Sequence, residues 1–292
     1  MSFLPCRLSA CLIAPLLLGV AAARAQFIDL GAAANFAGLE MGGSSFTYTI
    51  SKVTTEITGN VGIGPNGNFD FSGGSVIDGT IYAGAGATLS ISGGSGATGG
   101  IVQPSSLVTQ AIADSHTAAS YYAGLTPTQN LTSITGGTFT GNGGLNVYSV
   151  SGSLAIANTT LTLSGTASDT FVFNIYGGGN NLSRADIVLD GISASQVLFN
   201  LIGSGAQLTT TGHSNTQGIF LAENGAIDIQ GGTHTSDFIA GSSLTWQSGV
   251  NITQATSAVQ PVPEASAVAM SVGAVLLLGG LVLLREKRRQ AA

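Results

Sequence analysis

Residues 68–91 read NFDFSGGSVIDGTIYAGAGATLSI, and they set the pattern for most of the chain. Apolar and polar residues alternate over three to five positions in this stretch, and a glycine follows within a few residues of each run. Such period-2 runs, bounded by turn residues, are typical of short β-strands that bury one face. The stretch therefore predicts a series of short strands joined by tight glycine corners.

The same pattern recurs through the second half of the chain. Further strands are predicted at 138–140, 145–148, 154–156, 160–163, 171–175, 187–189, 197–201, 219–221 and 226–229. Two all-β architectures could use them. A sandwich needs antiparallel hairpins, yet Asn-Gly turns between paired strands are rare here. A solenoid of short strands with small-residue corners accounts better for the 43 glycines, so we favour an irregular β-solenoid.

One segment departs from this pattern. Residues 105–123 contain no glycine, and apolar residues recur at helical spacing, namely Leu107, Ala111, Ile112, Ala119 and Tyr122. Pro104 offers an N-terminal boundary, and Gly124 with Pro127 provides the stop. We therefore predict one amphipathic helix at about 105–123, with its apolar face along one side of the solenoid.

The charge distribution excludes several classes of partner. Only Lys52 and Arg184 of the eight basic residues fall between residues 26 and 264, whereas thirteen of the fourteen carboxylates do. Nucleic acids and anionic lipids need clusters of Lys and Arg, so neither is expected as a partner of this body. With 44% hydrophobic residues, the chain should nevertheless fold.

Residues 1–25 have the features of a secretory signal peptide. Arg7 precedes a largely apolar stretch at 8–22, and Ala23-Arg24-Ala25 supplies a small-x-small cleavage site at Ala23 and Ala25. Both cysteines, Cys6 and Cys11, lie within this segment. The exported protein is therefore expected to contain neither a disulfide nor a cysteine metal ligand.

The C-terminal segment has three parts. A linker and short motif at 255–264 end in Val262-Pro263-Glu264, and the uncharged residues 265–284 follow. At about 1.5 Å per residue, those twenty residues would span a hydrocarbon core of roughly 30 Å. The tail at 285–292 carries Arg285, Lys287, Arg288 and Arg289, which the positive-inside rule places in the cytoplasm. The segment thus predicts a transmembrane helix, and a plain C-terminal anchor is one interpretation.

This arrangement resembles the PEP-CTERM sorting signal of Gram-negative bacteria that make exopolysaccharide. Pro263 and Glu264 match its motif, Ala265 stands where a second proline is usual, and Val262, Arg285, Arg288 and Arg289 complete the likeness. The resemblance implies that an exosortase-type enzyme removes the helix. The protein would then pass from the membrane to the cell surface or the matrix.

The body resembles the bacterial and fungal ice-binding domain family. The likeness rests on residues 30–37, 59–65, 78–83, 105–128, 169–175 and 197–203. It implies a domain at 26–254 that folds as a right-handed β-helix with a long helix packed alongside. The family binds ice through a flat face of threonines and small residues. Three outward-facing pairs are candidates for an ice- or sugar-binding face: Thr138 and Thr140, Thr160 and Thr162, Thr209 and Thr211. Ordinary solvated strand threonines are the alternative interpretation.

Catalytic patterns are weak. Glycosidases need two carboxylates that face one groove, but Asp186 and Asp190 straddle a strand, and a turn separates Asp228 from Asp237. The histidines His116, His213 and His234 lack metal-ligand spacing, so no cofactor or metal is expected. We predict an exported, non-catalytic, structural or adhesive protein, with ice or exopolysaccharide as possible ligands. The alternative is a carbohydrate-active β-helix enzyme of the extracellular matrix.

Overall fold

The computed structural model describes residues 27–42, 45–49, 56–203, 205–247 and 249–255. The predicted signal peptide, most of the linker, the sorting motif, the C-terminal helix and the basic tail therefore lie outside the described residues. Within those described ranges, no helix combines the length and the apolar character that a membrane span requires.

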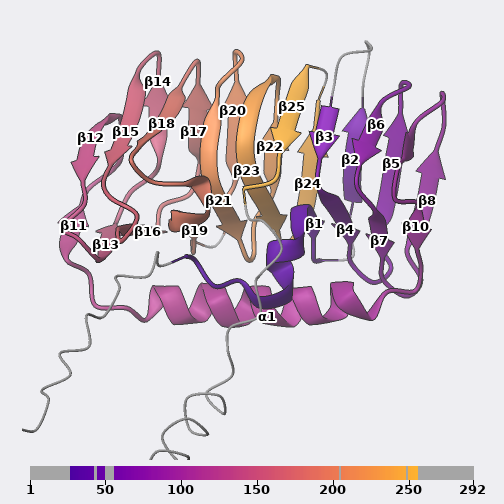
Figure 1. Cartoon of the computed structure of the whole chain (residues 1–292), viewed down its shortest axis with the longest axis horizontal. Helices are drawn as coiled ribbons and strands as arrows, with labels where there is room; N and C mark the ends of the chain where they lie inside the picture. The colour runs from indigo at the N-terminus through magenta and orange to yellow at the C-terminus, as the bar shows by residue number, and fades with distance from the viewer. Residues whose placement is uncertain (1–26, 43–44, 50–55, 204, 248, 256–292) are drawn as a thin grey trace, which may run out of the picture.

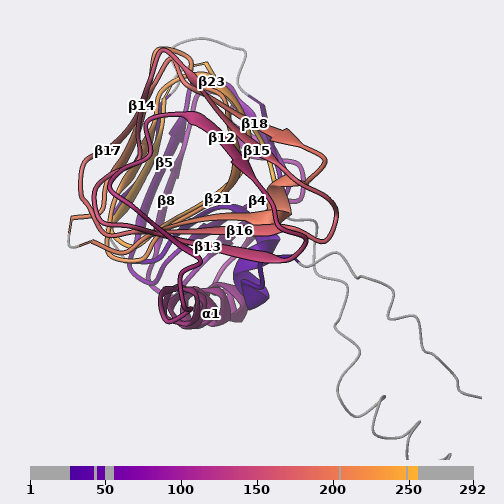
Figure 2. The same ribbon diagram turned by 90° about the vertical axis from the view of Figure 1, so that its left-hand side faces the viewer.

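The strands coil into a three-sided β-helix, which confirms the predicted solenoid and excludes the sandwich (Figure 2). We call its three sides the covered face, the eight-stranded face and the threonine face, and we define each by its strands. The covered face lies against the helix and contains β1 (Phe36–Glu40), β4 (Asn60–Ile63), β7 (Ile81–Ala83), β10 (Ile101–Val102), β11 (Gln129–Leu131), β13 (Leu145–Val150), β16 (Thr170–Ile175), β19 (Val197–Leu201), and most of β21 (Thr216–Ala222) and β23 (Gly232–Ala240).

The other two faces are open. The eight-stranded face contains β2 (Ser45–Thr49), β5 (Asn68–Ser72), β8 (Thr88–Ile91), β14 (Ala155–Ala157), β17 (Asn180–Ser183), β20 (Leu208–Thr211), β22 (Ile227–Ile229) and β24 (Ser243–Trp246). The threonine face contains β3 (Glu56–Thr58), β6 (Val76–Asp78), β9 (Gly96–Ala97), β12 (Gly137–Thr140), β15 (Thr160–Ser164), β18 (Asp186–Asp190), β25 (Val250–Thr253), and the first residues of β21 and β23.

The rungs are not stacked in chain order (Figure 1). The chain starts near the middle of the stack and winds outward through β1, β4, β7 and β10. Helix α1 (Ser106–Ala123) then returns along the whole stack to the opposite end. From β11 the chain winds inward until β23 pairs in parallel with β1 and β25 pairs with β3. The first and last rungs therefore meet at a seam in the middle of the molecule.

Helix α1 agrees with the predicted helix at 105–123, although its buried side is centred differently. Ser115 and Ala118 are buried beside the predicted Ala111, Ala119 and Tyr122. The predicted Leu107 and Ile112 are only partly buried at the edge. The helix packs on the covered face together with the short 3-10 helix η1 (Gly31–Asn35). A second 3-10 turn, η2 (Ala194–Gln196), precedes β19.

The strands of the covered face are buried on both sides. Val172 and Leu198 face the helix, whereas Phe173 and Phe199 face the interior of the β-helix. Such strands are predominantly apolar along their whole length, as in Thr170–Ile175, where Phe171, Val172 and Phe173 are consecutive, while the strands of the open faces alternate. The helix therefore converts one open face into a second hydrophobic core.

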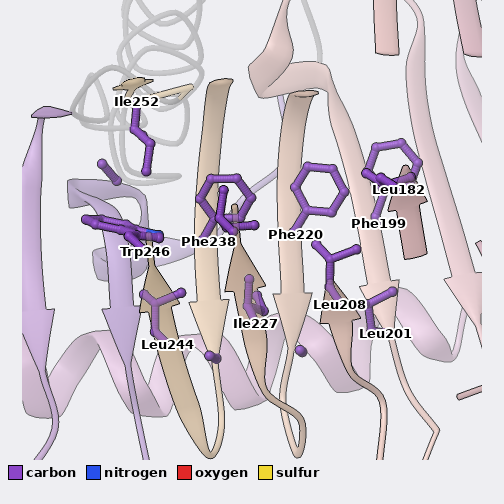
Figure 3. Close-up of a cluster of buried hydrophobic side chains, with 14 of the residues drawn as sticks. Leu182, Phe199, Leu201, Leu208, Phe220, Ile227, Phe238, Leu244, Trp246 and Ile252 are labelled. Atoms are coloured by element: carbon purple, nitrogen blue, oxygen red, sulfur yellow. The ribbon is translucent and has the colours of Figure 1, made fainter. Parts of the chain in front are cut away.

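A column of aromatic rings runs through the interior. Neighbouring rings stack with centroids 4.8–5.5 Å apart in the order Tyr148, Phe173, Phe199, Phe220 and Phe238. Figure 3 shows how the column continues toward the indole of Trp246, which comes from β24 at the seam. Offset stacking of aligned rings adds to the burial energy of each ring, so the column fixes the register of these rungs.

Candidate functional site

All six threonines proposed from the sequence face outward, but they do not form one surface. Thr138 and Thr140 lie on β12, and Thr160 and Thr162 lie beside them on β15 of the threonine face. Thr209 and Thr211 lie on β20 of the eight-stranded face. The structure thus brings four of the six residues together and places the third pair on another side of the β-helix.

The threonine face carries a row of aligned outward positions that crosses the seam. Thr138 is in register with Thr162, and Thr162 with Val188. On the rungs around the seam the aligned residues are Gln217, Thr235, Thr253, Thr58 and Asp78. Because neighbouring strands lie about 4.8 Å apart, the hydroxyl and methyl groups of Thr235, Thr253 and Thr58 repeat at nearly constant spacing. Val188 and Gln217 separate these three threonines from Thr162 and Thr138.

The central part of this row was missed in the sequence. Thr233 and Thr235 on β23 and Thr253 on β25 are exposed, and Thr58 on β3 lies next to Thr253. Residues 233–235 have the same Thr-x-Thr pattern as the three pairs proposed from the sequence, so this pair could have been proposed as well. Nothing local, however, indicates that residues near 58 and 253 share one patch. We call Thr58, Thr233, Thr235 and Thr253 the central threonine patch.

Four carboxylates also lie on the threonine face, and three of them accept hydrogen bonds from the adjacent rung. The amide of Asn215 donates to Asp186 at 2.7 Å. Ser164 Oγ donates to Asp190 at 3.0 Å, and Thr98 Oγ1 donates to Asp78 at 2.9 Å. Each of these three hydrogen bonds joins side chains on two adjacent rungs of the β-helix. The fourth carboxylate, Glu56, is exposed on β3.

The eight-stranded face is regular but more mixed in chemistry. Its central row aligns Asn181, Thr209, Asp228 and Thr245 on one side of β2, and Asp70 with Ser90 on the other side. Asp228 accepts hydrogen bonds from Gln230 at 2.9 Å and from Gln247 at 3.0 Å. Threonines on this face are therefore interrupted by carboxylates within the same row.

The three histidines do not assemble a catalytic or metal centre. His116 on α1 contacts Glu223 at 2.7 Å and ties the helix to a corner of the β-helix. His213 is exposed at another corner. His234 is buried, with Nδ1 2.9 Å from Thr216 Oγ1 and Nε2 3.0 Å from the carbonyl oxygen of Gly231. Within the described ranges, no three metal-ligating side chains of the His, Cys, Asp or Glu type lie together.

A groove of about 450 Å³ lies on the helix side of the molecule. It is bounded by residues 27–31, the second half of α1 and the start of β13 and β16, and both Asp29 and Asp114 line it. Asp29 accepts the N–H of Gly31 at 2.9 Å, and Asp114 accepts the N–H of Ala32 at 2.7 Å. The other oxygen of Asp114 accepts from Gln110 Nε2 at 2.7 Å. Both carboxylates are thus held as hydrogen-bond acceptors.

Several solved structures share this fold. An ice-binding protein from Arctic yeast, LeIBP, is 19% identical, with a TM-score of 0.60 over 82% of this chain and 98% of its own. Ice-binding protein 1 of Shewanella frigidimarina is 20% identical, with a TM-score of 0.57 over 80% and 99%. The protein from the Antarctic ascomycete Antarctomyces psychrotrophicus is 23% identical, with a TM-score of 0.56 over 80% and 100%.

At these identities the likeness concerns the fold. A comparison with curated proteins gave no match. The sequence model of the ice-binding-like family, however, matches residues 42–258, which include both open faces and α1. The chain therefore belongs to the ice-binding-like family.

Proposed function

We propose that the protein binds ice through the threonine face. The observation that carries this proposal is the register of Thr235, Thr253 and Thr58 across three neighbouring rungs at the seam. A second aligned pair, Thr138 and Thr162, lies farther along the same face. Membership of the ice-binding-like family and the names of the structural neighbours support ice as the ligand.

The chemistry of the row suits an ordered water surface. Each threonine presents one hydroxyl and one methyl group on a β-branched side chain with restricted χ1 freedom. A rigid array of this kind loses little side-chain entropy on binding. Because its groups are uncharged, it also avoids the large cost of dehydrating ions.

A bulky substitution in the central threonine patch tests the proposal. Thr235→Tyr should abolish thermal hysteresis and ice-recrystallisation inhibition, because the phenol ring would stand above the row and prevent flat contact. Thr209→Tyr on β20 is the matched control, since it places the same ring at a partly exposed threonine of the eight-stranded face. The two variants should retain the circular dichroism spectrum and the Tm of the unmodified protein.

The outcomes test two questions separately, namely whether ice is the ligand and which face binds it. No ice activity in the unmodified protein at high concentration would remove the ice proposal. Activity that is lost in Thr209→Tyr but kept in Thr235→Tyr would retain ice as the ligand and move the site to the eight-stranded face.

A carbohydrate-active enzyme is the second candidate, because Asp29 and Asp114 line one groove. Acid–base hydrolysis needs one carboxyl group that delivers a proton. Both oxygens of Asp114 instead already accept hydrogen bonds from N–H donors of the protein, so this carboxyl group is engaged as an acceptor. We therefore favour a non-catalytic role, and we expect no release of reducing ends from matrix polysaccharides. Such release, if it were lost in Asp114→Asn, would establish the enzyme instead.

We further propose that the chain is exported and sorted to the cell surface or the exopolysaccharide matrix, where it has a structural or adhesive role. The support is the sequence of residues 1–25 and 262–289. Mass spectrometry of the protein from its host should find a mature C-terminus near Glu264. Recovery of a peptide containing residues 276–284 would show that the apolar segment is retained as an anchor. A pull-down with the host's own polysaccharide tests the adhesive role.

A further inference from the structure

We propose that the groove beside α1 is a second binding site, and that it takes a short stretch of a neutral or amino-sugar polysaccharide. The groove lies on the helix side, and the threonine face lies on a different side of the triangular section (Figure 2). Its volume of about 450 Å³ falls in the range of small-molecule sites in proteins. This site is independent of the ice proposal.

Exposed aromatic rings are the first argument. Phe27 is 57% exposed and Tyr121 is 61% exposed, which makes them the two most exposed large apolar side chains among the described residues. Both line this groove. Tyr122 packs edge-on against Tyr121 with a centroid distance of 5.1 Å, which fixes the position of the outer ring. Exposed rings at the rim of a groove offer flat surfaces against which the C–H faces of sugar rings can stack.

Polar groups held in place inside the groove are the second argument. The Tyr122 hydroxyl accepts the N–H of Asp29 at 2.8 Å, so its own O–H can donate to a ligand. Asp29 and Asp114 are fixed by the backbone N–H groups of Gly31 and Ala32 in η1, and each carboxylate oxygen can accept more than one hydrogen bond. The groove therefore combines apolar stacking surfaces with acceptors for hydroxyl groups.

Charge selects among sugars. The groove contains two carboxylates, and Arg184, the one Lys or Arg among the described residues, lies at the corner between β17 and β18 rather than in the lining. A uronate or a sulfated sugar would meet repulsion without a compensating cation. Neutral hexoses and protonated amino sugars avoid that cost, and the latter would gain from the carboxylates.

Titration calorimetry with chitohexaose, cellohexaose, partly deacetylated chitosan oligomers and oligoalginate tests the proposal. The expected result is binding of one or more neutral or amino-sugar probes and no binding of the oligouronate. Tyr121→Ala should weaken that binding by tenfold or more, because it removes the exposed stacking surface. Tyr176→Ala is the matched control, since Tyr176 is 45% exposed and lies outside the groove lining.

Three results would overturn the site. These are no binding of any neutral or amino-sugar probe, equal binding of oligoalginate, and an equal loss of affinity in Tyr121→Ala and Tyr176→Ala. Ice activity should be unchanged in Tyr121→Ala. A negative ice assay would therefore not affect the interpretation of the sugar-binding measurement, and a negative sugar-binding result would not affect that of the ice assay.

Discussion

Gly38 faces the indole ring of Trp246 across the seam where the first and last rungs meet. Gly38 on β1 is in register with Phe238, the last ring of the aromatic column. A Cβ added at Gly38 would overlap the Trp246 ring and approach Leu244 at 3.2 Å. The column is thus continued by a side chain from another face, and only glycine leaves room for it.

Gly38→Ala should therefore destabilise the protein. Overpacking of a rigid core costs about 1–3 kcal/mol, and the indole cannot retreat because it is fully buried. Chemical denaturation should show a lower midpoint with an unchanged slope. Gly96→Ala is the control, because a Cβ there meets nothing within 4 Å. Equal stability of the two variants would show that the seam can relax.

His234 should make stability depend on pH in the mildly acidic range. Burial lowers the pKa of His234 to about 4, although its hydrogen bond to the Gly231 carbonyl opposes the shift. Between pH 6.5 and 4 the unfolded chain binds a proton that the folded chain does not, so the free energy of unfolding rises with pH across this window. The gain is about 3 kcal/mol, and it is complete above pH 6.5.

The pH dependence can be assigned with two variants. His234→Gln should flatten the slope of unfolding free energy between pH 4 and 6.5. His213→Asn is the matched control, because it replaces an exposed histidine at a corner of the β-helix. A slope that survives in His234→Gln would assign the effect to other groups.

Asn174 and Asn200 should hold the end of α1 on the covered face. Asn174 donates to the carbonyl oxygen of Tyr122 at 2.7 Å, and Asn200 donates to that of Ala119 and to the Asn174 side chain, each at 3.0 Å. Asn174→Ala removes the side-chain donor to the Tyr122 carbonyl and one acceptor of the Asn200 amide, at a cost of about 1–3 kcal/mol. Amide exchange in residues 119–123 should accelerate, whereas the exposed Asn181→Ala should not change it. Unchanged exchange in Asn174→Ala would mean that packing alone secures the helix.

Asp169 should be the most important acid for the corners at one end of the stack. Burial raises its pKa, but hydrogen bonds from the amides of Thr166 and Gly143 outweigh burial and bring it to about 2. The Gly143 bond is 2.6 Å long. The Asp169 carboxylate therefore stabilises the folded protein above pH 3.8, and this stabilisation is lost as the pH falls toward 2. Asp169→Asn should cost about 1.5–3 kcal/mol at pH 7. The exposed Asp190→Asn should cost less, and a reversed order in thermal denaturation would contradict this assignment.

Much of the fold could be predicted from residues near one another in the chain. Alternation at 160–163 and the glycine-free run at 105–123 led to a strand and a helix that the structure contains. The run of three consecutive apolar residues at 197–199 even carries the signal for a strand buried on both sides. These features are local because strand and helix periodicity are properties of a few consecutive residues.

The tertiary structure decided which face each strand joins and which rungs are neighbours. Thr209 and Thr162 look alike in the sequence, yet the corners before them place one on the eight-stranded face and the other on the threonine face. Thr58 and Thr253 are far apart in the chain, yet they are partners because α1 returns the chain and the last rung closes on the first. The sequence by itself determined the strands, the helix and the nearly charge-free body. The candidate surfaces depend on long-range pairing, which a local pattern cannot specify, because any alternating strand fits equally well on either open face.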